Sequence, residues 1–153
     1  MKFLLNIIIL GLASVYAQAQ VSHIGEVELL ELDDRTATFQ AEGYASKKGD
    51  TGNAAKELIF EKLFYEGIDG INDGEKVINN ITPKNKFYLD KFFQGKNASM
   101  NRFIAGEELL GSVTKKDGRF YGVYTITIKY SLLIRDLEMN KLHEKQQPAD
   151  LYH

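Results

Sequence analysis

The sequence predicts an α+β fold, with an antiparallel sheet of about four strands and one main amphipathic helix packed on one face of the sheet. Three observations lead to this fold class. A long stretch near the C-terminus has the alternation and the tight turn of a β-hairpin. Two shorter alternating segments lie near the N-terminus, and a segment between these regions has the period of a helix.

The hairpin signal runs from Phe103 to Leu137. Its second strand is expected over residues 120–132, where aromatic and β-branched side chains alternate. Residues 103–113 are the expected partner strand, and Asp117-Gly118 supplies the positive φ angles of a tight turn. Glycines that interrupt these strands predict bulges or bends: Gly106, Gly111 and Gly122.

Residues 1–19, MKFLLNIIILGLASVYAQA, have the pattern of a secretory signal peptide. One lysine precedes an apolar run that is too short to span a membrane, and Ala17-Gln18-Ala19 forms a small-x-small cleavage site. We expect cleavage after Ala19 and no membrane span in the mature chain; an uncleaved anchor is the alternative. The mature chain is then one domain, residues 20–140, followed by a polar tail, residues 141–153, that is expected to be disordered.

The chain contains no cysteine, so an exported form must be stabilised by a hydrophobic core and not by disulfides. Small extracellular animal domains usually carry disulfides, and their absence therefore favours a bacterial periplasm or cell envelope. The formal net charge of −2, with both signs mixed along the chain, does not support nucleic-acid binding.

Two strands are expected at residues 26–32 and 35–45, joined at Asp33-Asp34. Small side chains on one face of the second strand predict that the next element packs closely against it. They alternate along the strand as Ala37, Ala41, Gly43 and Ala45.

Residues 53–66 form the best predicted helix, and Gly67 suits its C-terminal end. Its candidate N-caps are Asp50, Thr51 and Asn53. A broad apolar stripe indicates that the helix lies half-buried across the sheet. Residues 68–101 are expected to be irregular, except for a short aromatic helix or strand at residues 87–93 whose rings cover the end of the core.

The order of these segments resembles a known family. A strand that ends in Gly43-Tyr44-Ala45 precedes the helix, and an irregular segment precedes FIAGEELLG (103–111), the Asp-Gly turn and YGVYTITI (121–128). The pattern resembles the small α+β domain of bacterial envelope proteins in the flagellar outer-membrane lipoprotein family, and the N-terminal domain of flagellar assembly protein T is similar. The resemblance spans residues 36 to about 137 and implies an envelope-associated structural or adaptor domain. This sequence departs from the family by lacking a lipid-attachment cysteine and by the long segment 68–101.

No catalytic, cofactor-binding or metal-binding residue is predicted. The histidines, His23, His143 and His153, lie near the chain ends, away from the expected strands and helix. The chain has no thiol, no nucleotide-binding fingerprint and no serine-nucleophile motif.

Two local patterns have plain explanations. A calcium-loop pattern begins at Asp69 but fails at its third and twelfth positions, Ile71 and Asn80, so we interpret it as a pair of Asp-Gly turns. The segments 80–82 and 97–99, which begin at Asn80 and Asn97, match the glycosylation sequon, which matters only in a eukaryotic host.

We therefore expect a non-enzymatic exported envelope protein that acts as an interaction or assembly module, through an envelope protein partner or through self-association. The candidate interaction edge is the last strand or its neighbour, because the solvent face of the last strand carries only one charge before Arg135. The candidate residues on the last strand are Tyr121, Val123, Thr125 and Thr127. The alternative is that this strand is central and that residues 68–101 cover its second face.

A competing function is a small-ligand carrier of the cystatin-like or nuclear transport factor 2-like kind, with a pocket between helix and sheet. The expected inward face of the sheet is apolar, which favours a filled core over a cavity. That face consists of Phe39, Ala41, Tyr124, Ile126 and Ile128.

Overall fold

The computed structural model describes residues 24–95 and 98–144. Several features expected from the sequence lie outside the described residues. They are the signal peptide with its cleavage site after Ala19, His23, Asn97, and residues 145–153 of the expected tail, including His153.

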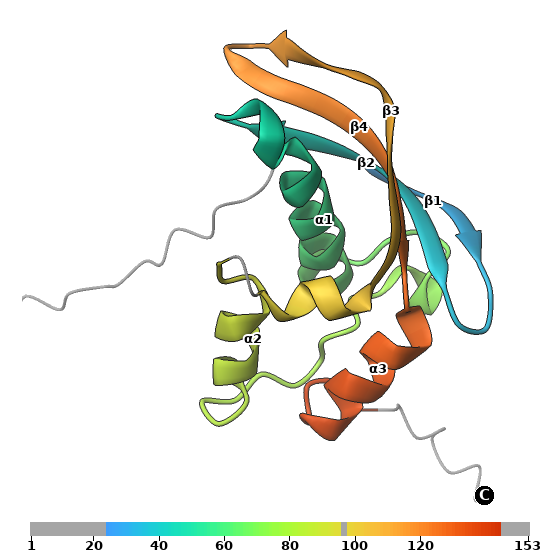
Figure 1. The fold of residues 1–153 in the computed structure, drawn as a ribbon. Coiled ribbons are helices and arrows are strands. Elements are labelled where there is room, and N and C mark those ends of the chain that lie inside the picture. Colours follow the sequence, from blue (N-terminus) through green and yellow to red (C-terminus); the bar gives the residue numbers. More distant parts are fainter. Residues whose placement is uncertain (1–23, 96–97, 145–153) are drawn as a thin grey trace, which may run out of the picture.

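Four strands form one antiparallel sheet: β1 (Val27–Leu32), β2 (Ala37–Ala45), β3 (Ile104–Lys116) and β4 (Arg119–Ile128). Their order across the sheet is β1-β2-β4-β3 (Figure 1). The α+β fold class with a four-stranded antiparallel sheet is confirmed. The two hairpins, β1–β2 and β3–β4, lie side by side, and β2 pairs with β4 between them.

The tight turn of the second hairpin is formed by Asp117 and Gly118, whose φ angles are 51° and 77°. Two successive positive φ angles match the twist of the strands on either side, so the turn predicted from Asp-Gly is confirmed. The first hairpin turns at Asp33, where the carboxylate accepts backbone N–H groups from Arg35 at 2.6 Å and Thr36 at 2.7 Å. These bonds hold the pKa of Asp33 below its usual value.

The three glycines expected to disturb the hairpin lie at two shifts in the register between β3 and β4. The register of β3 against β4 shifts between Ile104 and Gly106 and again between Leu110 and Thr114, which encloses Gly111. Gly111 has a φ angle of 79°, a conformation that other residues rarely adopt. Gly122 lies on β4 inside the second shift, between the pairs Leu110–Val123 and Thr114–Tyr121, while β4 stays in register with β2 there.

The last strand is shorter than the sequence predicts. β4 ends at Ile128, and helix α3 (Tyr130–Met139) follows, so the strand does not continue to Leu132. The buried residues of α3 recur at helical spacing, as Leu133, Asp136 and Leu137. Tyr130 and Leu132 continue the strand-like alternation by chance, because two or three residues are too few to distinguish a strand period of two from a helix period of 3.6.

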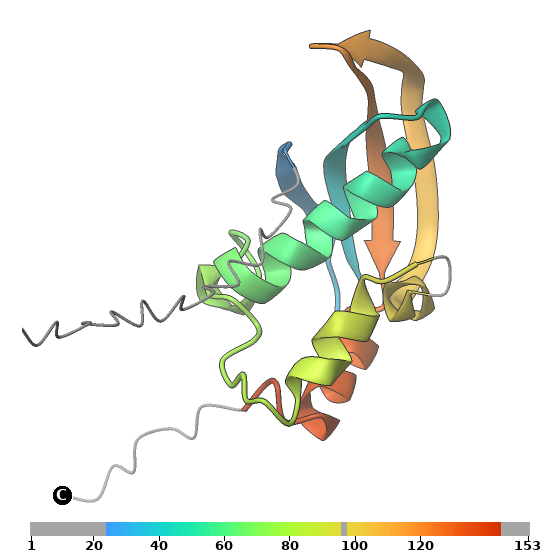
Figure 2. The same ribbon diagram turned by 90° about the vertical axis from the view of Figure 1, so that its left-hand side faces the viewer.

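Helix α1 (Thr51–Glu61) continues as a π-helical turn (Lys62–Glu66) and lies across one face of the sheet (Figure 2). A 3₁₀ turn (Lys48–Asp50) leads into it. The close packing expected on β2 is present: a Cβ atom added at Gly43 would lie 1.9 Å from the backbone oxygen of Thr51. Asp50 occupies the N-cap position but makes no capping hydrogen bond with its side chain.

The core lies between the sheet and α1 and continues toward α2 (Lys86–Phe92). Phe92 closes one end of it, with ring-centroid distances of 5.1 Å to Phe60, 4.8 Å to Phe64 and 5.7 Å to Phe103. The expected aromatic cover at residues 87–93 is therefore a helix that starts after Asn85. Phe87 is the exception, because it faces solvent.

Two further 3₁₀ turns, Asn72–Gly74 and Ser99–Phe103, lie within and after the irregular segment. Residues beyond α3 also pack on the domain. Leu142 is fully buried, and its backbone oxygen accepts the N–H groups of Asn79 at 3.1 Å and Asn80 at 3.3 Å. The packed part of the chain thus reaches past residue 140. In the described part of the chain, no helix has the length and apolarity that crossing a membrane requires.

Candidate functional site

The four residues of the candidate edge lie on β4, which is a central strand. Thr125, for example, is paired with Gln40 of β2 on one side and with Glu108 of β3 on the other. The interpretation of β4 as a free edge is therefore wrong, since both of its sides already have a neighbouring strand. Local alternation marks a strand but does not say how many neighbours it has.

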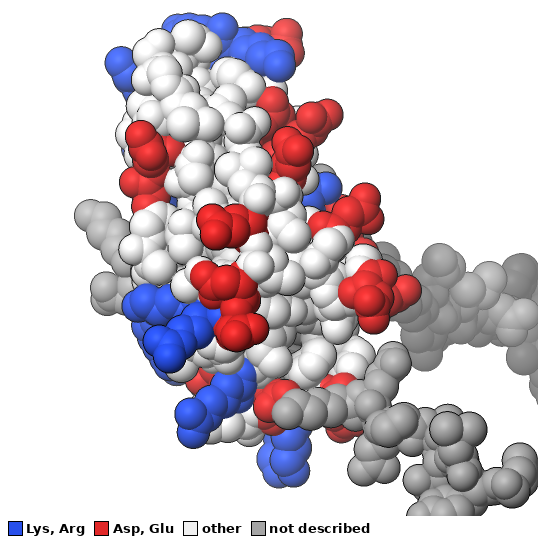
Figure 3. Space-filling model, turned by 90° about the vertical axis from the view of Figure 1, so that its right-hand side faces the viewer, with Lys and Arg blue, Asp and Glu red and all other residues white. Residues whose placement is uncertain are grey.

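The alternative was a central strand whose second face is covered by residues 68–101. The central position is confirmed, but the cover is wrong, because residues 68–101 do not lie on the other face of β4. They lie on the same side of the sheet as α1 (Figure 2). Figure 1 shows no helix or loop of the described residues on the opposite face, which we call the outer face and which is turned to the viewer in Figure 3. Its central side chains are half-buried, as expected for residues screened only by their neighbours on the sheet. These are Thr38, Gln40, Glu42, Tyr44, Tyr121, Val123, Thr125 and Thr127.

Cross-strand pairs occupy several of these outer-face side chains. The Tyr121 hydroxyl donates to Glu42 Oε1 at 2.9 Å, and this bond raises the pKa of Tyr121. The rings of Tyr44 and Tyr121 lie 4.8 Å apart, with the Lys116 ammonium 4.8 Å from the Tyr121 ring. Such pairs stabilise a sheet without any ligand, so they explain the aromatic and polar residues of this face.

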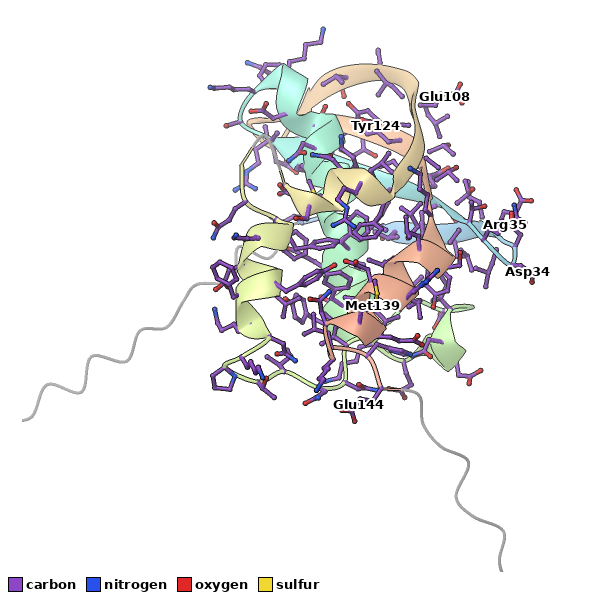
Figure 4. The ribbon with its side chains drawn as sticks, turned by 60° about the horizontal axis from the view of Figure 1, so that its bottom comes forward. Asp34, Arg35, Glu108, Tyr124, Met139 and Glu144 are labelled. Atoms are coloured by element: carbon purple, nitrogen blue, oxygen red, sulfur yellow. The ribbon has the colours of Figure 1, made fainter. Side chains whose placement is uncertain are left out.

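The free edges of the sheet are β1 and β3. β3 is the longer, and residues 106–110 are its longest stretch in regular register with β4, bounded by the two register shifts. We call residues 106–110 the β3 edge. Leu109 and Leu110 are exposed there, at 38% and 40% of their surface. Glu108 points away from the sheet into solvent (Figure 4). One side of the β3 backbone has no neighbouring strand, which leaves main-chain groups available for another chain.

A basic residue on α1 holds the inner side of the same edge. Lys56 Nζ lies 3.1 Å from Glu107 Oε2, and the two side chains are only partly exposed. This ion pair ties the edge to the helix. The regular segment begins at Gly106 and ends just before Gly111, next to the two register shifts.

The space between α1 and the sheet is filled. Phe39, Ala41, Ile126 and Ile128 are completely buried there and Tyr124 nearly so, as the apolar inward face predicts. The Tyr124 hydroxyl lies 2.6 Å from Thr51 Oγ1, which satisfies both buried groups. A carrier pocket at this place would need to displace packed side chains.

Within the described part of the chain, His143 and the loop aspartates Asp69 and Asp73 form no common metal site. Nδ1 of His143 lies 2.6 Å from the backbone oxygen of Val77, which anchors the C-terminal segment. Asp69 and Asp73 are on turns, next to Gly70 and Gly74 with φ angles of 86° and 80°. In residues 24–95 and 98–144, no three His, Asp or Glu side chains cluster as a metal site would require.

The sequon residue Asn80 is part of a hydrogen-bonded network. Its side-chain amide donates to the backbone oxygen of Lys141 at 3.1 Å and to Glu144 Oε1 at 2.9 Å. These bonds occupy the nitrogen that glycosylation would modify.

Comparison of this chain with protein-family models, with curated proteins and with solved structures finds no match.

Proposed function

We propose that this chain is a non-enzymatic, exported envelope protein that acts as an interaction module and binds an extended segment of another protein along the β3 edge. The observation that carries the proposal is the regular segment 106–110, which has no neighbouring strand on its outer side and contains two exposed leucines. An added strand would gain main-chain hydrogen bonds along this edge, and its side chains would be selected by the residues on either face.

Charge favours a different protein over a second copy as the partner. In a symmetric antiparallel pairing of two copies that uses all of residues 106–110, Glu108 of each copy would face Glu108 of the other. Like charges directly opposite each other destabilise a sheet. Pairing Glu108 with Lys116 of a second copy would have to cross the distorted backbone at Gly111.

The edge and the outer face together define the chemistry of the partner. By register, Glu108 and Leu110 lie on the outer face, opposite Thr125 and Val123. Figure 3 shows acidic side chains spread over this face, with basic side chains mainly toward its ends. The segment that fits carries a lysine or arginine opposite Glu108 and an apolar residue opposite Leu110.

Export rests on the sequence of residues 1–19, which has a basic start, a short apolar run and Ala17-Gln18-Ala19. The absence of cysteine favours a bacterial periplasm or cell envelope. An interaction module for an envelope assembly accounts for both the export signal and the unpaired edge.

The experiment is crosslinking and affinity capture from the native envelope, followed by binding and hydrogen exchange with the purified partner. Glu108→Lys is expected to weaken binding by at least about tenfold, because it opposes a basic partner. Glu75→Lys is the matched control, since Glu75 is an exposed glutamate in the loop after α1. Binding should also slow hydrogen exchange at amides 106–110.

Three results would contradict the proposal. Equal partner binding by wild type and Glu108→Lys would exclude the β3 edge as the binding site. Hydrogen exchange that is slowed by the partner only on another surface would exclude it as well. A protein that stays monomeric at every concentration and yields no crosslinked partner would exclude an interaction module.

A further inference from the structure

A groove lies at the end of the molecule away from the hairpin tip, between α2, the end of α3 and the loop that precedes α2. Its volume is about 680 Å³. Pockets that bind small molecules span roughly 300 to 1,000 Å³, so the groove has room for one. Met139 and Glu144, labelled in Figure 4, mark the end of α3 and of the segment that follows it.

The walls of the groove are held in place by side-chain amides. Asn85 Nδ2 donates to the backbone oxygens of Asn80 at 2.9 Å and of Lys141 at 3.0 Å. Asn80 Nδ2 donates to the same Lys141 oxygen at 3.1 Å. The loop and the end of α3 are therefore tied together at one point, which presents a preorganised surface to a ligand.

The lining is cationic. Lys84, Lys91, Arg102 and Lys141 all line the groove and are exposed. Among the described residues, no ion pair engages Lys84, Lys91 or Lys141. Arg102 Nη2 lies 3.6 Å from Asp136 Oδ1, so this carboxylate offsets the charge of Arg102. A second carboxylate, Glu144, accepts a hydrogen bond from the lining residue Asn80, which leaves the four cations in excess.

Apolar side chains lie next to these cations. Phe87 and Met139 line the groove and are each 64% exposed, which is unusual for residues of this size. The Lys91 ammonium lies 4.3 Å from the centre of the Phe87 ring. A cation beside an exposed ring and a thioether is complementary to a molecule with an anionic head and an apolar body.

Lys141 is held in a conformation that lysine seldom adopts. Its φ angle is 58°, in the left-handed region where glycine or asparagine is favoured. A lysine here brings a cation to the rim of the groove at some cost in backbone energy. A substitution that removes the charge of Lys141 but tolerates this backbone conformation therefore separates its contribution to binding from its effect on stability.

We propose that this groove binds a small anionic amphiphile, with a carboxylate or phosphate head among the basic side chains and an apolar body against Phe87 and Met139. The hollow shape favours a single small molecule over a membrane surface, which would meet a protruding apolar patch. This site is independent of the β3 edge.

The test is calorimetric titration with dodecanoate below its micellar concentration. Decanol and decyl maltoside, which have apolar chains of similar length and uncharged heads, test the apolar body alone. Inorganic phosphate and acetate test the anionic head alone. Dodecanoate is expected to bind at least about tenfold more tightly than the uncharged chains or the isolated heads, with weaker binding as salt is added. Vesicles containing phosphatidylglycerol test the membrane as an alternative.

The variants distinguish the groove from a general charge effect. Lys84→Glu with Lys141→Glu is expected to weaken dodecanoate binding by about tenfold or more, whereas Lys115→Glu at the hairpin tip should leave it unchanged. Lys141→Asn should keep or raise the unfolding midpoint, since asparagine tolerates the left-handed conformation, and should still weaken binding.

Four outcomes would overturn the proposal. They are no dodecanoate binding, equal binding of charged and uncharged chains, equal weakening by Lys115→Glu and by the double variant, and binding to anionic vesicles without binding to the monomeric amphiphile.

Discussion

Gly43 lies on the inward face of β2, directly against the first turn of α1. The 1.9 Å distance from an added Cβ to the Thr51 oxygen leaves no space for any side chain. Beside it, the hydroxyls of Thr51 and Tyr124 are paired at 2.6 Å. One missing side chain and one buried hydrogen bond thus set how closely the helix approaches the sheet.

Gly43→Ala is expected to destabilise the protein by about 1–3 kcal/mol or more, because the helix would have to move away from β2. Gly49→Ala is the control, since nothing lies within 4 Å of the added Cβ at that position. It should change stability by less than about 1 kcal/mol, in the stabilising direction. Urea unfolding of both variants measures the difference, and similar free energies of unfolding would place α1 elsewhere.

Tyr88 links α2 to α3 through a single hydrogen bond. Its hydroxyl donates to Asp136 Oδ2 at 2.5 Å, and burial together with this bond raises the pKa of Tyr88 well above its usual value of 10.0. A phenol whose pKa is raised on folding contributes stability that is fully present below the unfolded pKa. That stability is lost as the pH rises above it.

Tyr88→Phe is therefore expected to cost about 1–2 kcal/mol at neutral pH, through loss of the hydrogen bond. Above pH 10.0, the usual value for the Tyr88 phenol, wild type should lose stability faster than the variant, so the gap should narrow. Urea unfolding at neutral and alkaline pH measures both effects. A gap that stays constant or widens on the alkaline side would show that Tyr88 is not buried against Asp136.

At the level of elements, α1 is docked by a stripe of fully buried side chains, including Ile59, Phe60 and Leu63. The helix does not end at Glu61 but continues through a π-helical turn, in which Gly67 N–H reaches Lys62 O at 2.7 Å. This wider turn keeps Leu63 and Phe64 directed into the core. The stripe predicted from periodicity is confirmed as a packing surface.

Leu63→Ala is expected to cost roughly 2–5 kcal/mol, since it opens a cavity beneath the helix. Lys62→Ala should stay within about 0.5 kcal/mol, because its partner Glu66 is exposed and such pairs contribute little. Denaturant unfolding compares the two, and small, equal effects would mean that this end of the helix is not docked.

The central position of β4 leads to a prediction about its backbone. Thr125→Pro is expected to unfold the domain, because the N–H group of a central strand bonds to one neighbour or the other. Thr125→Ala keeps that N–H group and should remain folded. Circular dichroism and amide NMR spectra of the two variants provide the measurement. A folded proline variant would be incompatible with the order β1-β2-β4-β3.

For the whole molecule, two exposed regions lie at different places: the β3 edge on the sheet and the cationic groove at the end formed by α2 and α3. The two regions share no residue, so each can be altered without the other. The hydrophobic core between them accounts for stability in a chain that contains no cysteine.

Export predicts that the mature protein begins at Gln20 or within a residue or two, because Ala17-Gln18-Ala19 fits the cleavage pattern. N-terminal sequencing of the protein recovered from the native envelope measures this. Recovery of membrane-bound protein that still begins with Met1 would identify an uncleaved anchor.

The local signals of this chain determined its local structure. Asp117-Gly118 specified the hairpin turn, and the stripe around Leu63 located α1 and its buried face, because each depends on neighbours in the sequence. Alternation located the strands but extended the last one past Ile128 into α3. Only the tertiary structure decided which strands became edges, since strand order rests on hydrogen bonds between distant segments. It placed Thr125 in the centre and residues 106–110 at the edge, and it joined Asn80, Asn85 and Lys141 around a groove that no local period encodes.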